Sequence, residues 1–504
     1  EELRGLYETA KEKMGEQEAE IFDAHLTILG DEYSVREPII QRIREQKQNA
    51  AAAITDQFDE LAQMFRSLGD ELMAERAADA EDLKQQLLRI CLGCGRQDLS
   101  VLPGDVIVLA EELTPSDTVR MDTAHVKGIA TRLGGATAHS AIIARTLGIP
   151  AAAGIDGWQT EALNGHMAIL DGADGTLTVD PTDEETACYQ SRKAQADCEA
   201  QALEAFRTSP SQTKDGAALE ICANIGTPQE AQQAMKYGAD GVGLFRSEFL
   251  FMDRDALPTE DEQFEAYRTA AQTMAGKPLI IRTLDVGGDK KLPTLELPHE
   301  DNPFLGFRAI RMTLSHPEIF RPQLRAILRA AAYGDVRVMF PMIGSMDQLR
   351  EAKALLREQE QTLQAEGVPT GPVKVGMMVE IPAAAVLAEE FAKEVDFFSI
   401  GTNDLTQYTL AVERGNAAVA HLYAPEHPAV LRLIAMTAQA AAERHIPCGM
   451  CGEAAGDPKL APAFVGMGVN ELSMSPRRVP AVRKLLSGLT MDECRQAAGK
   501  LLHP

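Results

Sequence analysis

Two groups of residues in this chain could do chemistry, and they lie far apart in the sequence. The first is His139, which follows the Gly134-Gly135 turn and opens an apolar stretch that runs to Arg145. Glycines permit tight turns, and the N-terminus of a following helix attracts negative charge. A neutral imidazole is also a nitrogen nucleophile near pH 7. The turn therefore favours phosphoryl or other anion chemistry on His139, and a helix-capping turn with an incidental histidine explains it equally well.

The second group begins with arginines in the C-terminal half of the chain. Arginine presents forked donors that suit phosphate and carboxylate groups. Four arginines lie at or after predicted strands, namely Arg246, Arg282, Arg308 and Arg414. Surface salt bridges would account for one or two of them. Four together indicate an anionic substrate.

Carboxylates and an amide follow two further strands of the same region. Glu380 ends one strand, and Asn403 and Asp404 follow the next. Magnesium prefers oxygen ligands and is usually held by one or two carboxylates together with substrate oxygens. The spacing therefore predicts a Mg²⁺ site that includes Glu380 and Asp404. The alternative for Asp404 is that it caps the next helix.

A cysteine completes this group. Cys451 stands in the segment from Gly449 to Glu453, between residues that leave its sulfur approachable. A thiol that faces a metal-bound anion can act as an acid or as a nucleophile. The alternative is that Cys451 is a small buried hydrophobic residue.

The elements that must position this second group read as a (β/α)8 barrel. From about Gln212 the chain alternates apolar strands with helical segments eight times. The strand candidates are Leu219–Asn224, Gly241–Phe245, Leu279–Thr283, Val336–Pro341, Val373–Glu380, Val395–Gly401, Pro447–Gly452 and Val469–Met474. Active sites of such barrels lie at the carboxyl ends of the strands, so the polar residues there should converge.

The whole chain is predicted to be a multidomain α and α/β protein. Residues 1–93 have helical periodicity throughout and predict a bundle, either structural or a docking surface. Residues 94–182 contain short β-branched runs at Asp105–Leu109, Val126–Ile129 and Met167–Leu170 and predict a compact α/β domain. Residues 183–211 predict a helical linker, and residues 212–504 form the barrel. Domains on such a linker can swing.

Composition excludes several classes of function. A formal net charge of −26 disfavours nucleic acid and anionic lipid as partners. The apolar runs fall short of the roughly 20 residues that span a bilayer, so membrane insertion is not expected. Nothing in the sequence brings the close cysteine pairs together, so the eight cysteines indicate free thiols in a cytoplasmic protein rather than a zinc site or a disulfide framework.

With these residues in place, the chain resembles enzyme I of the bacterial phosphoenolpyruvate-dependent sugar phosphotransferase system. The resemblance covers nearly the whole chain, and it rests on long motifs. These are Gly134 to Arg145, Gly241 to Asp255, Asp285 to Lys290, Asn302 to Arg308, Ser399 to Tyr408 and Gly449 to Glu453.

The resemblance implies a role for each matching residue. It implies that His139 is phosphorylated by phosphoenolpyruvate, that Cys451 donates a proton to yield pyruvate, and that Glu380 and Asp404 bind magnesium. It implies substrate contacts at Arg246, Arg282, Asn403 and Arg414. It also implies transfer of the phosphoryl group to a histidine phosphocarrier protein that docks on the helical domain, and a homodimer formed through the barrels.

Three features depart from the family pattern. Ala136 replaces an arginine that is common in the family, and Arg132 introduces a positive charge before the glycines. The family's first strand would precede residue 1, so we expect a truncated N-terminus. The competing functions are a nitrogen-regulatory or fused enzyme I paralogue, an enzyme like pyruvate phosphate dikinase or phosphoenolpyruvate synthase, and an inactive scaffold.

Overall fold

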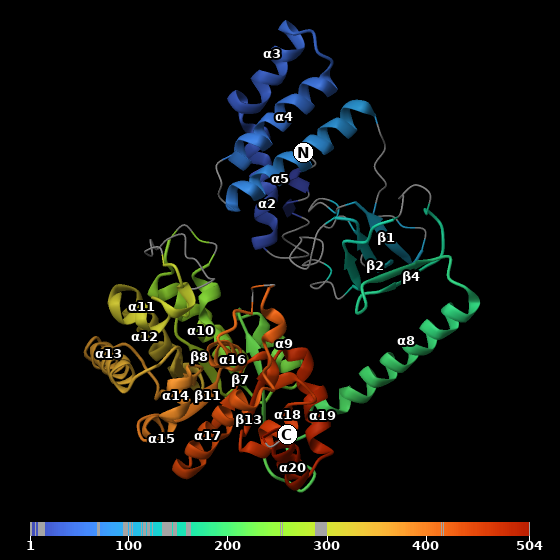
Figure 1. The fold of residues 1–504 in the computed structure, drawn as a ribbon. Coiled ribbons are helices and arrows are strands. Elements are labelled where there is room, and N and C mark those ends of the chain that lie inside the picture. Colours follow the sequence, from blue (N-terminus) through green and yellow to red (C-terminus); the bar gives the residue numbers. More distant parts are fainter. Residues whose placement is uncertain are drawn as a thin grey trace. The chain divides into compact units, whose positions relative to one another are not determined.

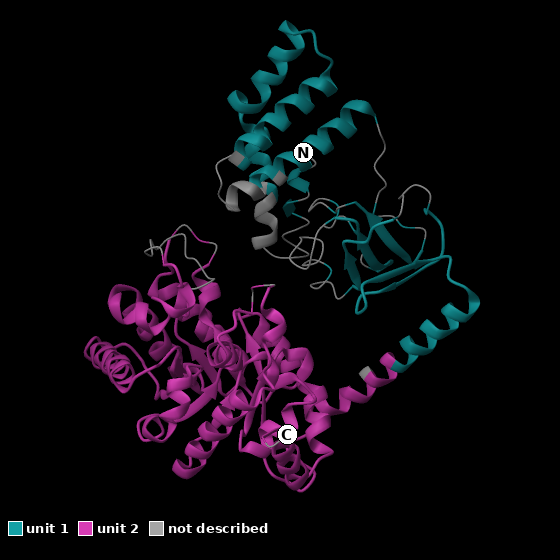
Figure 2. Cartoon of the chain, in the orientation of Figure 1, with its two compact units in different colours: residues 1–195 teal, residues 196–504 magenta. Residues whose placement is uncertain are grey.

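The structure is a computed structural model in which the chain forms two compact units, residues 1–195 and 196–504 (Figure 2). It describes residues 3–5, 7–8, 16–67, 71–93, 99, 102, 104–111, 113, 117, 121–122, 124–133, 144, 149–157, 163–252, 254, 256–287, 300–414, 416 and 418–502.

The first part of unit 1 is helical, as its periodicity predicts. Its elements are α2 (Glu16–Gly30), the π-helical η1 (Glu32–Arg36), α3 (Glu37–Glu45), α4 (Ala50–Ser67) and α5 (Glu71–Leu92) (Figure 1). Asp31 begins η1, since its carboxylate accepts the backbone N–H groups of Tyr33 and Ser34. Phe22, Phe58 and Leu83 are fully buried in the core that these helices share. Each large apolar side chain of this kind contributes about 1.5–3 kcal/mol to folding.

The second part of unit 1 is an α/β region. Strands β1 (Val106–Ala110), β2 (Val126–Thr131) and β3 (Ala151–Ala153) form a parallel sheet in the order β1-β2-β3, and β4 (Ala168–Asp171) pairs antiparallel with β5 (Thr176–Val179). The sequence pattern predicts β1, β2 and β4. It misses β3, which consists of three alanines without a β-branched residue, and β5.

The predicted histidine segment lies mostly outside the described residues. Of Gly134 to Arg145 only Ala144 is described, so the placement of His139 stays a prediction. Arg132, just before it, forms an ion pair with Glu111. A single helix, α8 (Asp183–Glu204), follows this region, as predicted for the linker.

Unit 2 is a closed barrel of eight parallel strands, which confirms the predicted fold. Its neighbours run in the order β10-β11-β12-β13-β6-β7-β8-β9. The strands are β6 (Glu220–Ile225), β7 (Val242–Arg246), β8 (Leu279–Arg282), β9 (Val336–Phe340), β10 (Lys374–Val379), β11 (Phe397–Ile400), β12 (Cys448–Met450) and β13 (Glu471–Met474). All eight candidates from the sequence correspond to a strand, and β13 closes the barrel against β6.

Helices surround these strands. They are α9 (Glu230–Lys236), α10 (Glu260–Thr273), α11 (Ile310–Ser315), α12 (Pro317–Ala330), α13 (Met346–Ala365), α14 (Pro382–Val386), α15 (Ala388–Phe391), α16 (Thr402–Leu410), α17 (Pro428–Arg444), α18 (Ala461–Met467), α19 (Val479–Ser487) and α20 (Met491–Leu502) (Figure 1). The main apolar core contains buried residues of both strands and helices. A smaller cluster draws one residue from each of β7 to β11 and adds a cysteine; its members are Leu244, Ile280, Met339, Met378, Phe397 and Cys451.

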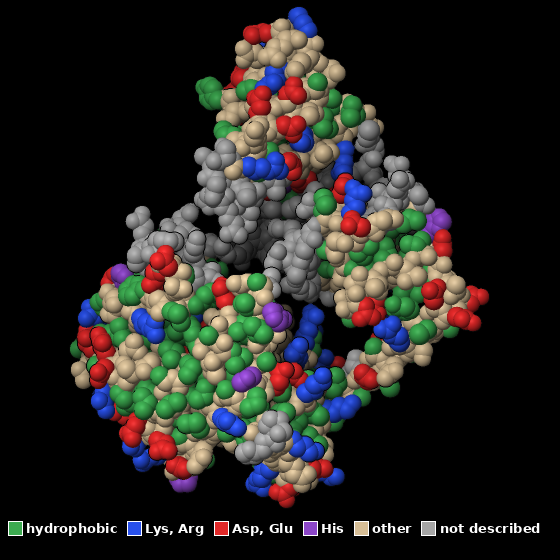
Figure 3. Space-filling model, in the orientation of Figure 1, with side chains coloured by type: hydrophobic (Ala, Val, Ile, Leu, Met, Phe, Trp, Pro, Cys, Tyr) green, Lys and Arg blue, Asp and Glu red, His purple; other side chains and the backbone are tan. Residues whose placement is uncertain are grey.

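The surface mixes both signs of charge. Figure 3 shows acidic and basic side chains scattered over both units, with hydrophobic side chains between them. None of the helices in the described part of the chain combines the length and the apolar character that a membrane span requires.

Candidate active site at the barrel mouth

A cavity of about 750 Å³ is lined by residues that end or follow the barrel strands. Its volume is in the range of small-molecule sites. The lining includes every predicted site residue except His139, namely Arg246, Arg282, Arg308, Glu380, Asn403, Asp404, Arg414 and Cys451. Strand register explains part of this convergence, because Arg246 and Arg282 are partners at the ends of β7 and β8.

Two of the arginines are buried and locked by carboxylates. Arg282 donates from Nη2 to Oε1 of Glu248 at 2.5 Å, and its Nη1 lies 3.1 Å from Oδ2 of Asp285. Arg308 lies 3.0 Å from Asp285 and 3.3 Å from Asp404. Burial opposes the charged forms, but these carboxylates outweigh it and raise the pKa values of Arg282 and Arg308. Both guanidinium groups therefore stay charged and fixed in direction.

Glu248 and Asp285 line the cavity beside these arginines, and sequence reasoning did not single them out. Both are buried, with 1% exposure each. Buried arginines need counter-ions. The sequence did contain a signal for these two residues, because an acidic residue follows each arginine at these two predicted strand ends. Glu248 follows Arg246 by two residues, and Asp285 follows Arg282 by three.

The other two arginines are held less firmly. The guanidinium carbon of Arg246 lies 4.8 Å from the ring centroid of Phe249, and its buried Nε has no hydrogen-bond partner among the described residues. Arg414 is half-exposed, and its Nη1 is 3.9 Å from Oε1 of Glu453. A pair of that kind contributes little. The salt-bridge alternative thus describes Arg414 at most. Of the four predicted arginines, Arg246 and Arg414 are the ones most available to an anion in the cavity.

Glu380 is a buried carboxylate in a negative environment. Its exposure is 1%, and Oε1 accepts the backbone N–H of Met342 at 2.6 Å. Met342 has a φ of 55°, a strained angle for a side-chain-bearing residue, and such strain is found at functional sites. Burial, followed by the charges of Asp404 and Asp285, raises the pKa of Glu380 to about 8.

The space beside Glu380 and its chemistry fit a hard divalent cation. A Cβ atom at Gly401 would lie only 2.9 Å from Oε2 of Glu380, so glycine keeps this oxygen accessible. Glu380 and Asp404 repel each other across the same cavity. A cation would relieve that repulsion, and carboxylate oxygens are the ligands that Mg²⁺ prefers.

Asp404 does not cap the helix that contains it. The N-cap of α16 is Gly401, without a side-chain cap, and Asp404 lies in the first turn with Oδ1 near Arg308. The neighbouring Asn403 accepts the backbone N–H of Glu453 through Oδ1 at 3.1 Å. This leaves its NH2 group as the part of the side chain that can donate to an anion.

Cys451 is both buried and adjacent to the cavity. It is 5% exposed and belongs to the small apolar cluster, as the hydrophobic alternative requires, but it also lines the cavity. Burial raises the pKa of its thiol to about 12, against smaller opposing effects of Ser399 and Arg282. The thiol is therefore protonated near neutral pH, which suits a proton donor better than a nucleophile.

Comparison with known proteins places this site in a family. Three families of PEP-utilising enzymes match the chain: the N-terminal family at residues 1–76, the mobile domain at 102–175 and the PEP-binding domain at 200–491. The last of these covers the barrel and the whole cavity lining.

Full-length relatives agree with this assignment. Proteins named phosphoenolpyruvate-protein phosphotransferase from Bacillus sp. (strain S) and from Geobacillus stearothermophilus are each 47% identical over 98% of this chain and 85% of their own length. The Staphylococcus aureus (strain MRSA252) protein of that name is 44% identical over 99% of this chain and 87% of its own. This chain belongs to the phosphoenolpyruvate-protein phosphotransferase family of PEP-utilising enzymes.

Proposed function

We propose that this chain transfers the phosphoryl group of phosphoenolpyruvate to its own His139 and then to a histidine phosphocarrier protein, releasing pyruvate. This is the first step of sugar uptake by the phosphotransferase system. The observation that carries the proposal is the cavity at the barrel mouth, where the four predicted arginines, the carboxylates of Glu380 and Asp404 and the protonated thiol of Cys451 all contribute to the lining. Family membership supports the same reaction.

The groups proposed to bind the substrate differ in how firmly the protein holds them. Arg246, Arg414 and the NH2 group of Asn403 are available to hold the phosphate and carboxylate of phosphoenolpyruvate. Arg282 and Arg308 add positive charge at fixed positions, because each is bound to two carboxylates. Donors fixed in advance stabilise developing charge without reorganising during the reaction.

Glu380 and Asp404 would hold Mg²⁺ beside the substrate, and the ion would stabilise the enolate oxygen as it leaves phosphorus. In the first step the imidazole nitrogen of His139 forms a bond to phosphorus, and the bond from phosphorus to the enolate oxygen breaks. The thiol of Cys451 then gives its proton to the enolate carbon, which yields pyruvate, and the resulting thiolate regains a proton from water.

Each region takes a part in this proposal. Residues 1–93 bind the phosphocarrier, residues 94–182 carry the phosphohistidine, residues 183–211 link them to the barrel, and residues 212–504 bind phosphoenolpyruvate. Exposed apolar side chains at Tyr33 and Met64 support a docking surface on the helices. A homodimer of barrels and a cytoplasmic location complete the proposal, and sedimentation of the purified chain tests the first of these.

Labelling with phosphoenolpyruvate tests the proposed function. The chain is incubated with Mg²⁺ and phosphoenolpyruvate that carries labelled phosphorus, and the protein-bound label is then exposed to acid and to base. We expect an acid-labile, base-stable label on wild type and none on His139→Ala. A wild type that takes up no label, or a His139→Ala variant that takes up as much, contradicts the proposal.

A further inference from the structure

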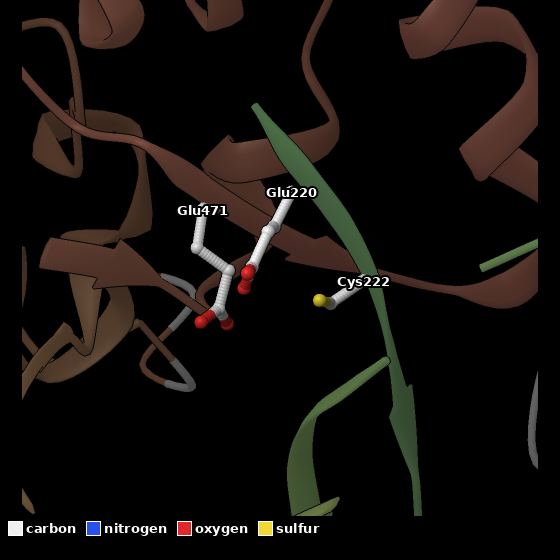
Figure 4. A group of neighbouring side chains, drawn as sticks. All are labelled: Glu220, Cys222 and Glu471. Atoms are coloured by element: carbon white, nitrogen blue, oxygen red, sulfur yellow. The ribbon is translucent and has the colours of Figure 1, made fainter. Parts of the chain in front are cut away.

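A second group of chemically reactive side chains lies at the opposite end of the barrel strands. Glu220 is the first residue of β6, Cys222 follows it by two, and Glu471 is the first residue of β13. β6 and β13 are paired, with Glu471 beside Glu220. Figure 4 shows both carboxylates and the thiol directed toward a common space, and one ligand atom from each residue lies within 4.8 Å of the others.

Glu471 has a buried oxygen without a partner. The residue is 4% exposed, and its Oε1 makes no hydrogen bond to any described residue. A Cβ atom at Gly243 would collide with this same oxygen, so the neighbouring strand leaves room beside it. A carboxylate oxygen without hydrogen bonds in the interior is costly, and native proteins normally satisfy such atoms with a partner, a water or an ion.

The charges around this space are predominantly negative. Glu220 on β6 repels Glu471, and Arg337 on β9 attracts both carboxylates. Arg337 donates its own hydrogen bonds to Asp335, from Nη2 at 2.7 Å and Nε at 3.3 Å. Two carboxylates and a thiol thus share one guanidinium that is already bound elsewhere, and a divalent cation would restore the balance.

We propose that Glu220, Cys222 and Glu471 form a binding site for a divalent cation of the Zn²⁺ class. A thiolate with two carboxylates suits Zn²⁺ better than the hard ions that all-oxygen sites select. Zinc-to-ligand bonds of about 2.0–2.3 Å place tetrahedral ligand atoms roughly 3.3–3.8 Å apart. The three ligand atoms lie within 4.8 Å of one another, so side-chain rotations that bring them about 1 Å closer complete the site. Water supplies the fourth ligand.

The position of the site gives it a structural consequence and an access route. An ion held there joins β6 to β13, the first and last strands of the barrel, whose pairing closes it. Glu220 is exposed, so the ion reaches the site from solvent. Binding releases the thiol proton of Cys222 to water, and affinity therefore rises with pH.

Cobalt spectroscopy tests this inference on the complete chain. The protein is saturated with Mg²⁺ to fill the mouth and titrated with Co²⁺, whose thiolate complexes have a sulfur-to-metal charge-transfer band in the near ultraviolet. We expect a band that saturates at one equivalent and disappears when Zn²⁺ is added. Chelator competition then gives the Zn²⁺ affinity.

Matched variants identify the thiol. Cys222→Ser should abolish the band and weaken Zn²⁺ binding by roughly 100-fold or more. Cys448→Ser, which changes an equally buried thiol on β12, should retain both, and so should Cys451→Ser at the mouth. A band that survives Cys222→Ser, a band lost in Cys451→Ser, or a wild type without a band overturns the proposal.

Glu471→Gln covers the case in which Cys222→Ser does not fold. This substitution keeps the shape of the side chain and should weaken Zn²⁺ binding by at least about 10-fold while the circular dichroism spectrum is unchanged. An unchanged affinity for Zn²⁺ in a folded Glu471→Gln variant also overturns the proposal.

Discussion

Asp285 holds two buried arginines at the barrel mouth, and its replacement by asparagine is expected to destabilise the barrel strongly. Its carboxylate lies 3.1 Å from Arg282 and 3.0 Å from Arg308, and the three side chains are 2%, 7% and 3% exposed, respectively. Asparagine preserves the shape and one acceptor oxygen. It removes the charge that faces both guanidinium groups and places an NH2 donor against one of them.

The expected cost follows from burial and from the contacts that remain. Removing one partner of a buried ion pair costs about 3–5 kcal/mol. Arg282 keeps Glu248 and Arg308 keeps Asp404, so the lower end, about 3 kcal/mol, applies. For a barrel of this size, about 2 °C per kcal/mol gives a fall of roughly 6 °C in Tm.

Asp261→Asn is the matched control. Asp261 also pairs with an arginine, since its Oδ1 lies 2.8 Å from Nη1 of Arg329, but its side chain is 84% exposed. Arg329 likewise keeps a second carboxylate, Glu260. An exposed pair contributes about 0–1 kcal/mol and is screened by salt, so this variant should melt within about 2 °C of wild type.

Calorimetry is the suitable assay. The single tryptophan, Trp158, belongs to the segment matched by the mobile domain, whereas calorimetry records the melting of the barrel itself. We expect Asp285→Asn to lower Tm by the same amount at low and high salt, and to raise the KM for phosphoenolpyruvate. Equal Tm values for Asp285→Asn and Asp261→Asn, or a loss in Asp285→Asn that salt removes, would refute the reasoning.

Four further predictions concern the thiol, the carboxylate at the mouth and a helix cap. Cys451→Ala should slow pyruvate formation by about 100-fold or more, and should slow phosphoryl exchange between His139 and the phosphocarrier much less; equal losses would make the thiol structural. Since the pKa of Cys451 is about 12, iodoacetamide at pH 8 should modify the exposed Cys188 far faster, as peptide mass spectrometry will show, and similar rates would contradict this. Glu380→Gln, which still accepts a backbone hydrogen bond, should weaken Mg²⁺-dependent labelling by at least about 10-fold; full labelling at low Mg²⁺ would remove Glu380 from the metal site. At the start of α10 the backbone N–H of Thr259 donates a hydrogen bond to the Glu262 carboxylate and lowers its pKa from 4.5 to about 2. The charged form of Glu262 therefore stabilises the fold above pH 4.5, and this contribution is lost as the pH falls toward 2. Glu262→Gln should therefore cost about 1 kcal/mol at pH 7 and less with each step from pH 5 to pH 3, and a cost that does not change with pH in calorimetry would contradict this assignment.

The periodicity of the chain was enough to predict the barrel and the residues at its mouth. Strands buried on both faces are nearly continuous apolar runs, and this pattern is clear in β10 and β11, while the eightfold alternation of strand and helix located the other strands. Parallel strands bring their carboxyl ends to one rim, so residues that end or follow strands, such as Arg246, Glu380 and Cys451, had to meet. This pattern is local and repeats along the chain, so it can be recognised in the sequence before the fold is known.

Only the tertiary structure decided which of these residues are fixed and which are free. Nothing in the sequence distinguishes Arg282 and Arg308 from Arg246. In the structure Glu248 binds Arg282 and Asp285 binds Arg308, and these pairs form only because the folded barrel buries their side chains together. The same holds at the other rim, where Glu220 and Glu471 are separated by most of the barrel in sequence. The predicted barrel implies that β13 pairs with β6, but the register that sets Glu471 beside Glu220 depends on long-range packing and not on any local pattern.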